Sequence, residues 1–331
     1  MSSNSDRIVA FDPDAGKSKS NKISMDNLPV IYDFDYLAFT LGVDKSKLQD
    51  MIDSPEKYYR TFYIKKRNGK LRQIDEPDNE LKRIQRWILT EILYKMTCSD
   101  YAKAYIPAVS IKENAIPHLN CKTLVAIDIK DFFPSIKLEH ILPVFSGLDY
   151  CGKVIDALAK LCCLNDCLPQ GAPTSAYLSN LVMKDFDIKI GNYCNCNMIK
   201  YTRYADDMTF SGTIRLKRLI TLVDNGLDEL GLKSNNSKFK IMRDGHRKKV
   251  TGIVVNEKMQ VSRDYRMRIK QEIYYIEKFG LQNHISHIGA DPSNYISHLM
   301  GKIQYALSIN PNDAQMKLCC SKLKTYAKNI K

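Results

Sequence analysis

Long hydrophobic runs are missing from this 331-residue chain, and their absence excludes a membrane-spanning protein. No stretch approaches the roughly 18 consecutive apolar residues that a membrane helix needs. Residues 1–25 also lack the apolar core and the small-residue cleavage site of a secretory signal. Hydrophobic residues make up 44% of the sequence and charged residues 26%, which is close to the usage of soluble proteins. We therefore expect a soluble, cytoplasmic protein with no membrane among its partners.

Paired cysteines with the C-x₂-C spacing of a zinc site are also absent. The ten cysteines occur as two adjacent pairs, one C-x-C and single residues. This pattern predicts buried free thiols in a reducing compartment rather than a metal site or a disulfide framework. No internal repeat is visible.

Acidic residues are scarce relative to basic ones, and the net charge is +13. From position 211 to the end, 22 Lys and Arg stand against 10 Asp and Glu, a net +12. Because each phosphate that Lys or Arg neutralises releases counterions, this asymmetry favours a polyanionic partner. A solvated basic face is the alternative.

The residue pattern predicts an α+β fold. Residues 1–25 are rich in Ser, Asn, Lys and Asp and predict a mobile N-terminal arm. Two β-rich runs flank Arg67-Asn68-Gly69-Lys70 and predict a basic hairpin, since Asn-Gly between such runs is a strong hairpin signal. Further strands are expected at residues 124–129, 198–204, 208–210, 239–242 and 250–255. Helices are expected at residues 35–51, 80–96, 138–146, 153–164, 175–190 and 216–230, and again beyond residue 264.

Three acidic residues occupy positions that need a chemical explanation. Asp128 ends an apolar strand, and Asp206 and Asp207 lie at the tip of a predicted hairpin, where adjacent carboxylates repel each other. A solvated Asp-Asp turn is one reading. Antiparallel pairing of the two segments would instead gather three carboxylates at one end of a sheet. Three such groups suit two Mg²⁺ ions, which can activate an attacking hydroxyl and hold a departing pyrophosphate, as polymerases require.

Three motifs then carry a family resemblance. Tyr204-Ala205-Asp206-Asp207 is a Y-x-D-D box, and the segment D-I-K-D-F-F-P-S-I begins at Asp128. The segment L-P-Q-G-A-P-T-S, which begins at Leu168, lies between them. In this order, with a basic hairpin upstream, the motifs resemble those of reverse transcriptases over about residues 58–255.

Two further segments narrow the resemblance to the bacterial enzymes of retrons. N-A-I-P-H from Asn114 to His118 resembles their N-A-x-x-H signature, and Val250-Thr251-Gly252 resembles their V-T-G signature. A capping or core histidine is the alternative for His118. Group II intron-type or other bacterial reverse transcriptases are the alternative family, and an RNA-binding scaffold with a vestigial polymerase site is the alternative class.

The resemblance implies a right-hand polymerase fold. Beyond the arm at 1–25, it implies N-terminal helices and fingers at 26–120, a palm with interleaved fingers helices and the metal site at 121–256, and a short helical thumb at 257–331. About 75 residues follow Val255, which is too few for a thumb and a ribonuclease H domain together. We therefore expect a host ribonuclease H to remove the template.

The resemblance also assigns residues to sites. The catalytic and metal-binding set, for two Mg²⁺ ions with Mn²⁺ as a substitute, is Asp128, Asp206 and Asp207, with the Ile129 carbonyl as an extra ligand. The nucleotide-binding set is Arg72, Lys65 or Lys66, Phe133, Gln170, Gly171 and Lys238. The RNA-binding set is Asn114, His118, Val250, Thr251, Gly252, Arg263, Arg266 and Lys270.

The implied roles each have a plainer alternative. Phe133 occupies the steric-gate position, where its ring would reject a ribose 2′-hydroxyl, but it could be a core residue. Arg72 would bind the triphosphate, but the hairpin face could simply be solvated. Lys238 would assist departure of pyrophosphate, but it could be a surface lysine. The basic stripe of Arg263, Arg266 and Lys270, at helical spacing, would contact nucleic acid or only solvent.

As a family, retron enzymes copy their own structured noncoding RNA into RNA-linked single-stranded DNA, called msDNA. Synthesis is primed from a guanosine 2′-hydroxyl of that RNA. The implied partners are this RNA and its DNA product, deoxynucleoside triphosphates, and an effector protein in antiphage defence.

Overall fold

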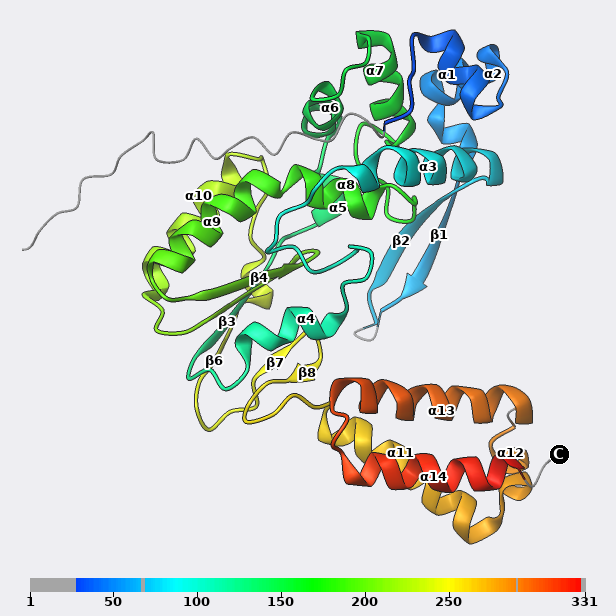
Figure 1. Ribbon diagram of the computed structural model, residues 1–331, viewed down its shortest axis with the longest axis vertical. Helices are drawn as coiled ribbons and strands as arrows, with labels where there is room; N and C mark the ends of the chain where they lie inside the picture. Colours follow the sequence, from blue (N-terminus) through cyan, green and yellow to red (C-terminus); the bar gives the residue numbers. More distant parts are fainter. Residues whose placement is uncertain (1–27, 67–68, 290, 329–331) are drawn as a thin grey trace, which may run out of the picture.

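The computed structural model describes residues 28–66, 69–289 and 291–328, and its elements form three parts (Figure 1). Helices and a two-stranded ribbon come first, a four-stranded sheet with its helices follows, and a group of helices ends the chain. The predicted mobile arm at 1–25 lies outside the described residues, as do Arg67 and Asn68 of the predicted hairpin.

The N-terminal segment forms two helices, α1 (Phe34–Leu41) and α2 (Lys45–Asp53), where the sequence predicts one over residues 35–51. Gly42 ends α1 with a left-handed φ of 62°, and the Asp44 side chain begins α2 by accepting a hydrogen bond from the Ser46 amide. The single-helix prediction is wrong because a C-cap glycine and an N-cap aspartate lie two residues apart.

The predicted basic hairpin is confirmed. Strands β1 (Tyr59–Lys65) and β2 (Leu71–Pro77) pair antiparallel, with Lys65 opposite Leu71. The flanking elements are the 3₁₀ turn η2 (Pro55–Tyr58), helix α3 (Asn79–Glu91) and the 3₁₀ turn η3 (Leu93–Lys95). The apolar face of α3 is buried in the main core, so the helix predicted from residue 80 forms, with a 3₁₀ turn at its end.

The four-stranded sheet has the strand order β4-β5-β3-β6. Its strands are β3 (Leu124–Asp128), β4 (Lys200–Tyr204), β5 (Asp207–Ser211) and β6 (Lys240–Met242). β3 pairs antiparallel with β5, and Asp128 lies directly opposite Asp207. This confirms the pairing that the positions of the acidic residues predict.

Helices cover both faces of the sheet because successive side chains along a strand point to opposite faces and enter two different cores. Val125 and Ile127 of β3 join the main core with the helices of residues 184–196 and 216–228, whereas Leu124 joins a second core with Ala115 and the C-terminal helices. The helices of this part are α4 (Ile111–Ala115), α5 (Phe132–Ser135), α6 (Leu138–Ser146), α7 (Gly152–Leu161), α8 (Ser175–Val182), α9 (Lys184–Cys196) and α10 (Leu216–Asp228). Two 3₁₀ turns, η4 (Ile116–His118) and η5 (Asn236–Lys238), complete it.

The strand predicted over residues 250–255 is wrong. The chain forms a hairpin of two short strands, β7 (Lys249–Val250) and β8 (Ile253–Val254), with Thr251 and Gly252 between them. Both turn residues have positive φ, 45° and 93°, as a two-residue hairpin turn requires.

The predicted helical C-terminal region is confirmed. Its helices are α11 (Arg263–Phe279), α12 (Leu281–Ile288), α13 (Pro292–Ile309) and α14 (Ala314–Lys328). They enclose the second core, and in the view of Figure 1 they lie below strands β1 and β2. None of the described helices is long and apolar enough to cross a membrane.

The cysteines match their prediction in part. All ten are free thiols, as expected, and five of them are buried. Cys151 and Cys196 are exposed: Cys151 is the N-cap residue of α7, and Cys196 is the last residue of α9.

Candidate active site

Three carboxylates meet at one end of the four-stranded sheet. Asp128 ends β3, Asp207 begins β5 opposite it, and Asp206 lies in the turn between β4 and β5. The amide of Ile129 donates a hydrogen bond of 2.9 Å to the Asp206 carbonyl, which ties this turn to the end of β3. Strand pairing thereby brings Asp128 close to Asp206 and Asp207, which lie 78 and 79 residues further along the chain.

The acidic residues repel one another in this position. The pKa of Asp206 is raised to about 6, first by burial and then by the charges of Asp128 and Asp207. The pKa of Asp207 is also raised, by burial and then by Asp128. Such a cluster is stabilised by a cation.

Lys238 of η5 and Asn235, the residue before η5, stabilise the negative charge of the Asp128 carboxylate. The Lys238 ammonium lies 2.7 Å from one carboxylate oxygen, and the Asn235 side-chain amide donates 2.9 Å to the other. The Asn235 main-chain amide also donates to the Asp128 carbonyl, at 2.7 Å. The Lys238 side chain is 57% exposed whereas that of Asp128 is 5% exposed, so the lysine can leave without disturbing the core.

The carboxylate oxygens are the donor type that a divalent cation prefers. In this conformation, however, the three side chains are not gathered around one common position. Among the described residues, no three His, Cys, Asp or Glu side chains lie close enough together to hold a metal ion. Both oxygens of Asp128 are engaged by Lys238 and Asn235 instead. The Ile129 carbonyl accepts no hydrogen bond from the described part of the chain and remains available as an oxygen ligand. An ion would therefore replace the Lys238 ammonium at hard carboxylate donors.

A buried ion pair beneath the turn fixes its geometry. Arg203 and Asp187 are both 0% exposed and lie 2.6 Å apart, with a second hydrogen bond of 2.8 Å between them. Arg203 also donates to the Asn180 side chain and to the Ala205 carbonyl, each at 3.1 Å. Ala205 has a φ of 57°, so the arginine holds an unusual turn residue immediately before Asp206.

Two residues of the predicted nucleotide set, Gln170 and Gly171, contact strand β2, which carries Arg72. The Asp75 amide of β2 donates 2.9 Å to the Gln170 carbonyl. Gly171 has a φ of 143°, and a Cβ there would come within 2.6 Å of the Asp75 carbonyl oxygen. Glycine is thus required by close approach to β2. Arg72 and Lys65 are exposed on the hairpin, and Phe133 is half-buried at the start of α5.

The two residues assigned from the N-A-x-x-H signature are inside the protein. Asn114 and His118 are 0% exposed, so neither side chain presents atoms to an RNA in this conformation. His118 contacts the hydroxyls of Ser211 and Thr202 at 2.7 and 2.8 Å, and burial lowers its pKa to about 4. Asn114 donates 3.3 Å to the Thr251 hydroxyl, which joins the two signature segments. These surroundings are those of a core histidine, which is the alternative that the sequence left open for His118.

The remaining RNA-binding candidates differ in exposure. Val250 is buried, whereas Gly252 is exposed. On α11, Arg263 and Lys270 are exposed, but Arg266 lies 3.4 Å from Asp313, which is buried. Arg266 is thereby committed to packing α11 against the start of α14.

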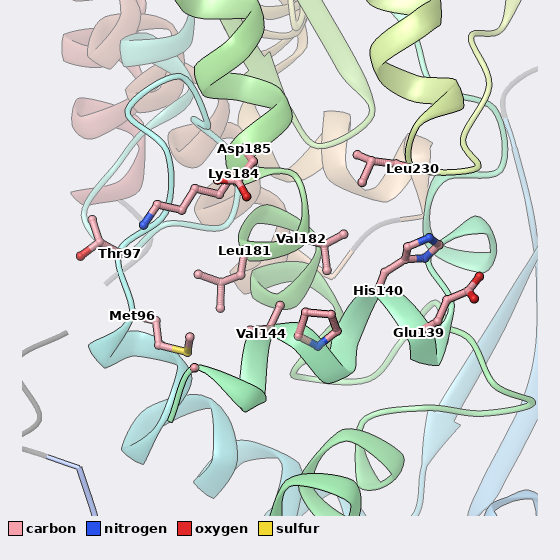
Figure 2. A pocket seen from close by; sticks show the side chains of 12 residues that line it. Met96, Thr97, Glu139, His140, Val144, Leu181, Val182, Lys184, Asp185 and Leu230 are labelled. Carbon is pink, nitrogen blue, oxygen red and sulfur yellow. The ribbon is translucent and has the colours of Figure 1, made fainter. Parts of the chain in front are cut away.

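A separate groove of about 400 Å³ lies between α6 and the α8–α9 junction (Figure 2). Apolar side chains such as Val144, Leu181 and Val182 line its middle, and charged side chains stand at its two ends. None of the predicted site residues lines it. The groove is therefore not part of the carboxylate site.

Sequence reasoning missed Asn235 and the Arg203–Asp187 pair. Asn235 gives no signal, because it lies in a polar loop. Arg203 and Asp187 do give one, since each is a charge at a position whose neighbours at strand or helix spacing are apolar.

Comparison with known proteins agrees with this geometry. Residues 64–275 match the family model described as reverse transcriptase (RNA-dependent DNA polymerase). The retron Ec86 reverse transcriptase of Escherichia coli is 31% identical over 310 residues, which cover 91% of this chain and 93% of that protein. The retron Mx65 reverse transcriptase of Myxococcus xanthus is 30% identical, over 87% of this chain and 71% of that protein. The predicted right-hand polymerase fold and enzyme class are confirmed. This chain therefore belongs to the reverse transcriptase family, among the retron enzymes, and is an RNA-directed DNA polymerase.

Proposed function

We propose that the protein copies a cognate structured noncoding RNA into RNA-linked single-stranded DNA, by nucleotidyl transfer at two divalent ions. The observation that carries the proposal is the convergence of Asp128, Asp206 and Asp207 at one end of the sheet. Mutual repulsion of these acids favours cation binding, and the buried Arg203 keeps the turn in place.

Asp128, Asp206 and Asp207, with the Ile129 carbonyl, would hold two Mg²⁺ ions, for which Mn²⁺ can substitute. The ions supply activation of the primer hydroxyl and neutralisation of the charge that develops on the pyrophosphate. Lys238 neutralises Asp128 in their absence and, with its long exposed side chain, can turn toward the departing pyrophosphate.

The incoming deoxynucleotide would lie between the hairpin and the end of the sheet. Arg72 and Lys65 bind the triphosphate, Phe133 excludes a ribose 2′-hydroxyl, and Gln170 and Gly171 bound the pocket. Support comes from the contact of Gln170 and Gly171 with β2, the strand that carries Arg72.

We assign the polymerase subdomains as follows: the N-terminal helices and fingers span residues 26–120, the palm spans 121–256 and the thumb spans 257–331. The RNA would contact the turn of half-buried Thr251 and exposed Gly252, and the exposed cations of α11, Arg263 and Lys270. Asn114, His118, Val250 and Arg266 support these surfaces from within.

Within a cell, the DNA product would act with an effector protein in antiphage defence, and a host ribonuclease H would remove copied template. A group II intron-type enzyme differs in its priming chemistry. We infer priming from a guanosine 2′-hydroxyl, because the chain matches retron enzymes over most of its length.

The Asp206→Asn variant tests the catalytic site. Extension of a primed RNA template in Mg²⁺ should fall below detection, since one ligand charge is lost. Its melting temperature should stay equal or rise, because an acid whose pKa is raised by burial and repulsion destabilises the fold when ionised. Asp149→Asn, at an exposed residue of the α6–α7 loop, is the matched control and should remain active.

Nucleic acid that copurifies with the protein tests the product. After protease and ribonuclease treatment, we expect single-stranded DNA that carries a 2′–5′ linked RNA stub sensitive to debranching enzyme. DNA with an ordinary 3′–5′ junction, or no linked RNA, would contradict retron priming while leaving the polymerase assignment intact.

A further inference from the structure

Tyr105 has a backbone conformation that a bulky residue rarely adopts. Its φ is 61°, in the left-handed region, and the residue is 46% exposed. Glycine would adopt this conformation without strain, whereas an aromatic residue there is an outlier of the kind that gathers at functional sites. The ring must therefore contribute something that glycine cannot.

The loop around Tyr105 is fastened to the strand that leads to the catalytic turn. Ala104, the preceding residue, is buried, and its carbonyl accepts a hydrogen bond of 2.7 Å from Asn180. The Lys103 amide donates 2.8 Å to the Arg203 carbonyl. Asn180 and Arg203 belong to the same buried network that holds Ala205, so Tyr105 is placed in fixed relation to Asp206.

The surroundings of the ring belong to the nucleotide pocket. Its centroid lies 6.4 Å from that of Phe133, with the two planes at 51°. Burial raises the pKa of the Tyr105 phenol, the charge of Asp206 raises it further, and the charge of Arg72 lowers it. The ring thus packs beside Phe133, in the electrostatic field of Asp206 and Arg72. Its hydroxyl makes no hydrogen bond to the part of the chain that the structure describes.

We propose that Tyr105 is a specificity-determining residue, whose ring forms with Phe133 an aromatic wall against which the sugar and base of the incoming deoxynucleotide pack. The inference rests on the proposed function, because it takes Phe133 and Arg72 as parts of the nucleotide pocket. Base and sugar packing on an aromatic face is strong enough to govern nucleotide affinity. Phe133 would face the 2′ position, and Tyr105 would limit how far the Phe133 ring can turn aside.

The test compares Tyr105→Gly, Tyr105→Phe and the control Ala108→Gly in single-nucleotide primer extension. Ala108 is exposed in the same loop with a φ of 62°, so glycine relieves the same kind of strain there without removing the ring. Tyr105→Gly should raise KM for the deoxynucleotide about tenfold, which corresponds to about 1.4 kcal/mol, with kcat nearly unchanged. It should also lower the preference for deoxynucleotides over ribonucleotides.

The other variants separate the ring from the backbone. Tyr105→Phe should keep KM within about twofold of wild type, because the ring rather than the hydroxyl packs on the substrate. Both glycine variants should melt at an equal or higher temperature than wild type. Ala108→Gly should leave KM and the sugar preference unchanged.

Three outcomes overturn the inference or its basis. An unchanged KM and sugar preference in Tyr105→Gly would show that the ring does not contact substrate. An equal rise of KM in Tyr105→Gly and Ala108→Gly would assign the effect to loop flexibility. A wild-type protein that fails to extend the primer would contradict the proposed function itself.

Discussion

The four-stranded sheet and the C-terminal helices use charged residues in opposite ways. At the sheet, Arg203 of β4 and Asp187 of α9 are wholly buried and bonded to each other. On α11, Arg263, Arg268 and Lys270 are exposed, and none of them forms an ion pair with a residue that the structure describes. A buried, paired charge fixes a conformation, whereas an exposed, unpaired one remains available to a polyanion.

Helix α11 contains both a charge that is paired within the protein and charges that are exposed and unpaired. Arg266 stands on the same helix as the exposed cations, yet its guanidinium lies 3.4 Å from Asp313, whose carboxylate also accepts hydrogen bonds from the Gln315 and Met316 amides. Helical spacing alone places Arg266 in the basic stripe, and only packing against α14 separates it from its neighbours.

Replacing Arg203 should have the largest effect on stability. Arg203→Met leaves Asp187 buried without its cation, which should lower the free energy of unfolding by about 3–5 kcal/mol in a urea titration. The double variant Arg203→Met/Asp187→Leu should recover much of this loss, since neither charge is then left unpaired. If the single variant loses less than about 1 kcal/mol, the pair does not hold the turn.

The buried His118 should make stability depend on pH. Its folded pKa of about 4 lies below the unfolded value near 6.5, so the unfolded chain binds the proton first as pH falls. Stability should be complete above about pH 6.5 and decline toward pH 4, by up to about 3 kcal/mol. His118→Gln should lack this part of the decline. Parallel pH profiles of unfolding for the two proteins would place the titration elsewhere.

The exposed cations of α11 should affect binding rather than stability. Replacing Arg263, Arg268 and Lys270 by Ala should weaken RNA binding and lower the log–log salt slope by about 2–3 units, at ~0.7–0.9 per phosphate contact. Arg266 is kept because it bonds to Asp313. Extension at saturating template should persist, because Asp206 and its neighbours are untouched.

A matched control removes the same charge from another surface. Lys153, Arg215 and Lys217 are exposed on or beside α7 and α10, and their replacement by Ala should change the slope far less. Equal slopes for the two triple variants would mean that the RNA does not follow α11.

Lys238 should show the smallest effect on stability, because its side chain is 57% exposed. Lys238→Met should change the free energy of unfolding by no more than about 1 kcal/mol. The Mg²⁺ concentration for half-maximal activity should fall, since the ammonium no longer competes for Asp128. Lys238→Arg keeps the charge and should keep the wild-type requirement. A higher Mg²⁺ requirement in Lys238→Met would show that the lysine does not occupy a cation position.

Short-range signals account for most of the features that the sequence predicted correctly. The β1–β2 hairpin and the helical C-terminal region follow from local periodicity and turn residues, whereas the pairing of Asp128 with Asp207 follows from the shared chemistry of the acids. Gly42 with Asp44, and Thr251 with Gly252, carried equally local signals that divide one predicted helix and one predicted strand. Those two predictions are wrong because capping and turn residues override apolar periodicity at these positions.

The sequence by itself determined the chemistry: three acids in the right order, glycine at 171 and an excess of cations near the end of the chain. Only the tertiary structure decided which polar residues face solvent. It placed His118 between Ser211 and Thr202, Lys238 on Asp128 across 110 residues, and Tyr105 beside Phe133. Residue type and spacing fix what a group can do, but burial and partners depend on contacts between distant segments, which local patterns do not encode.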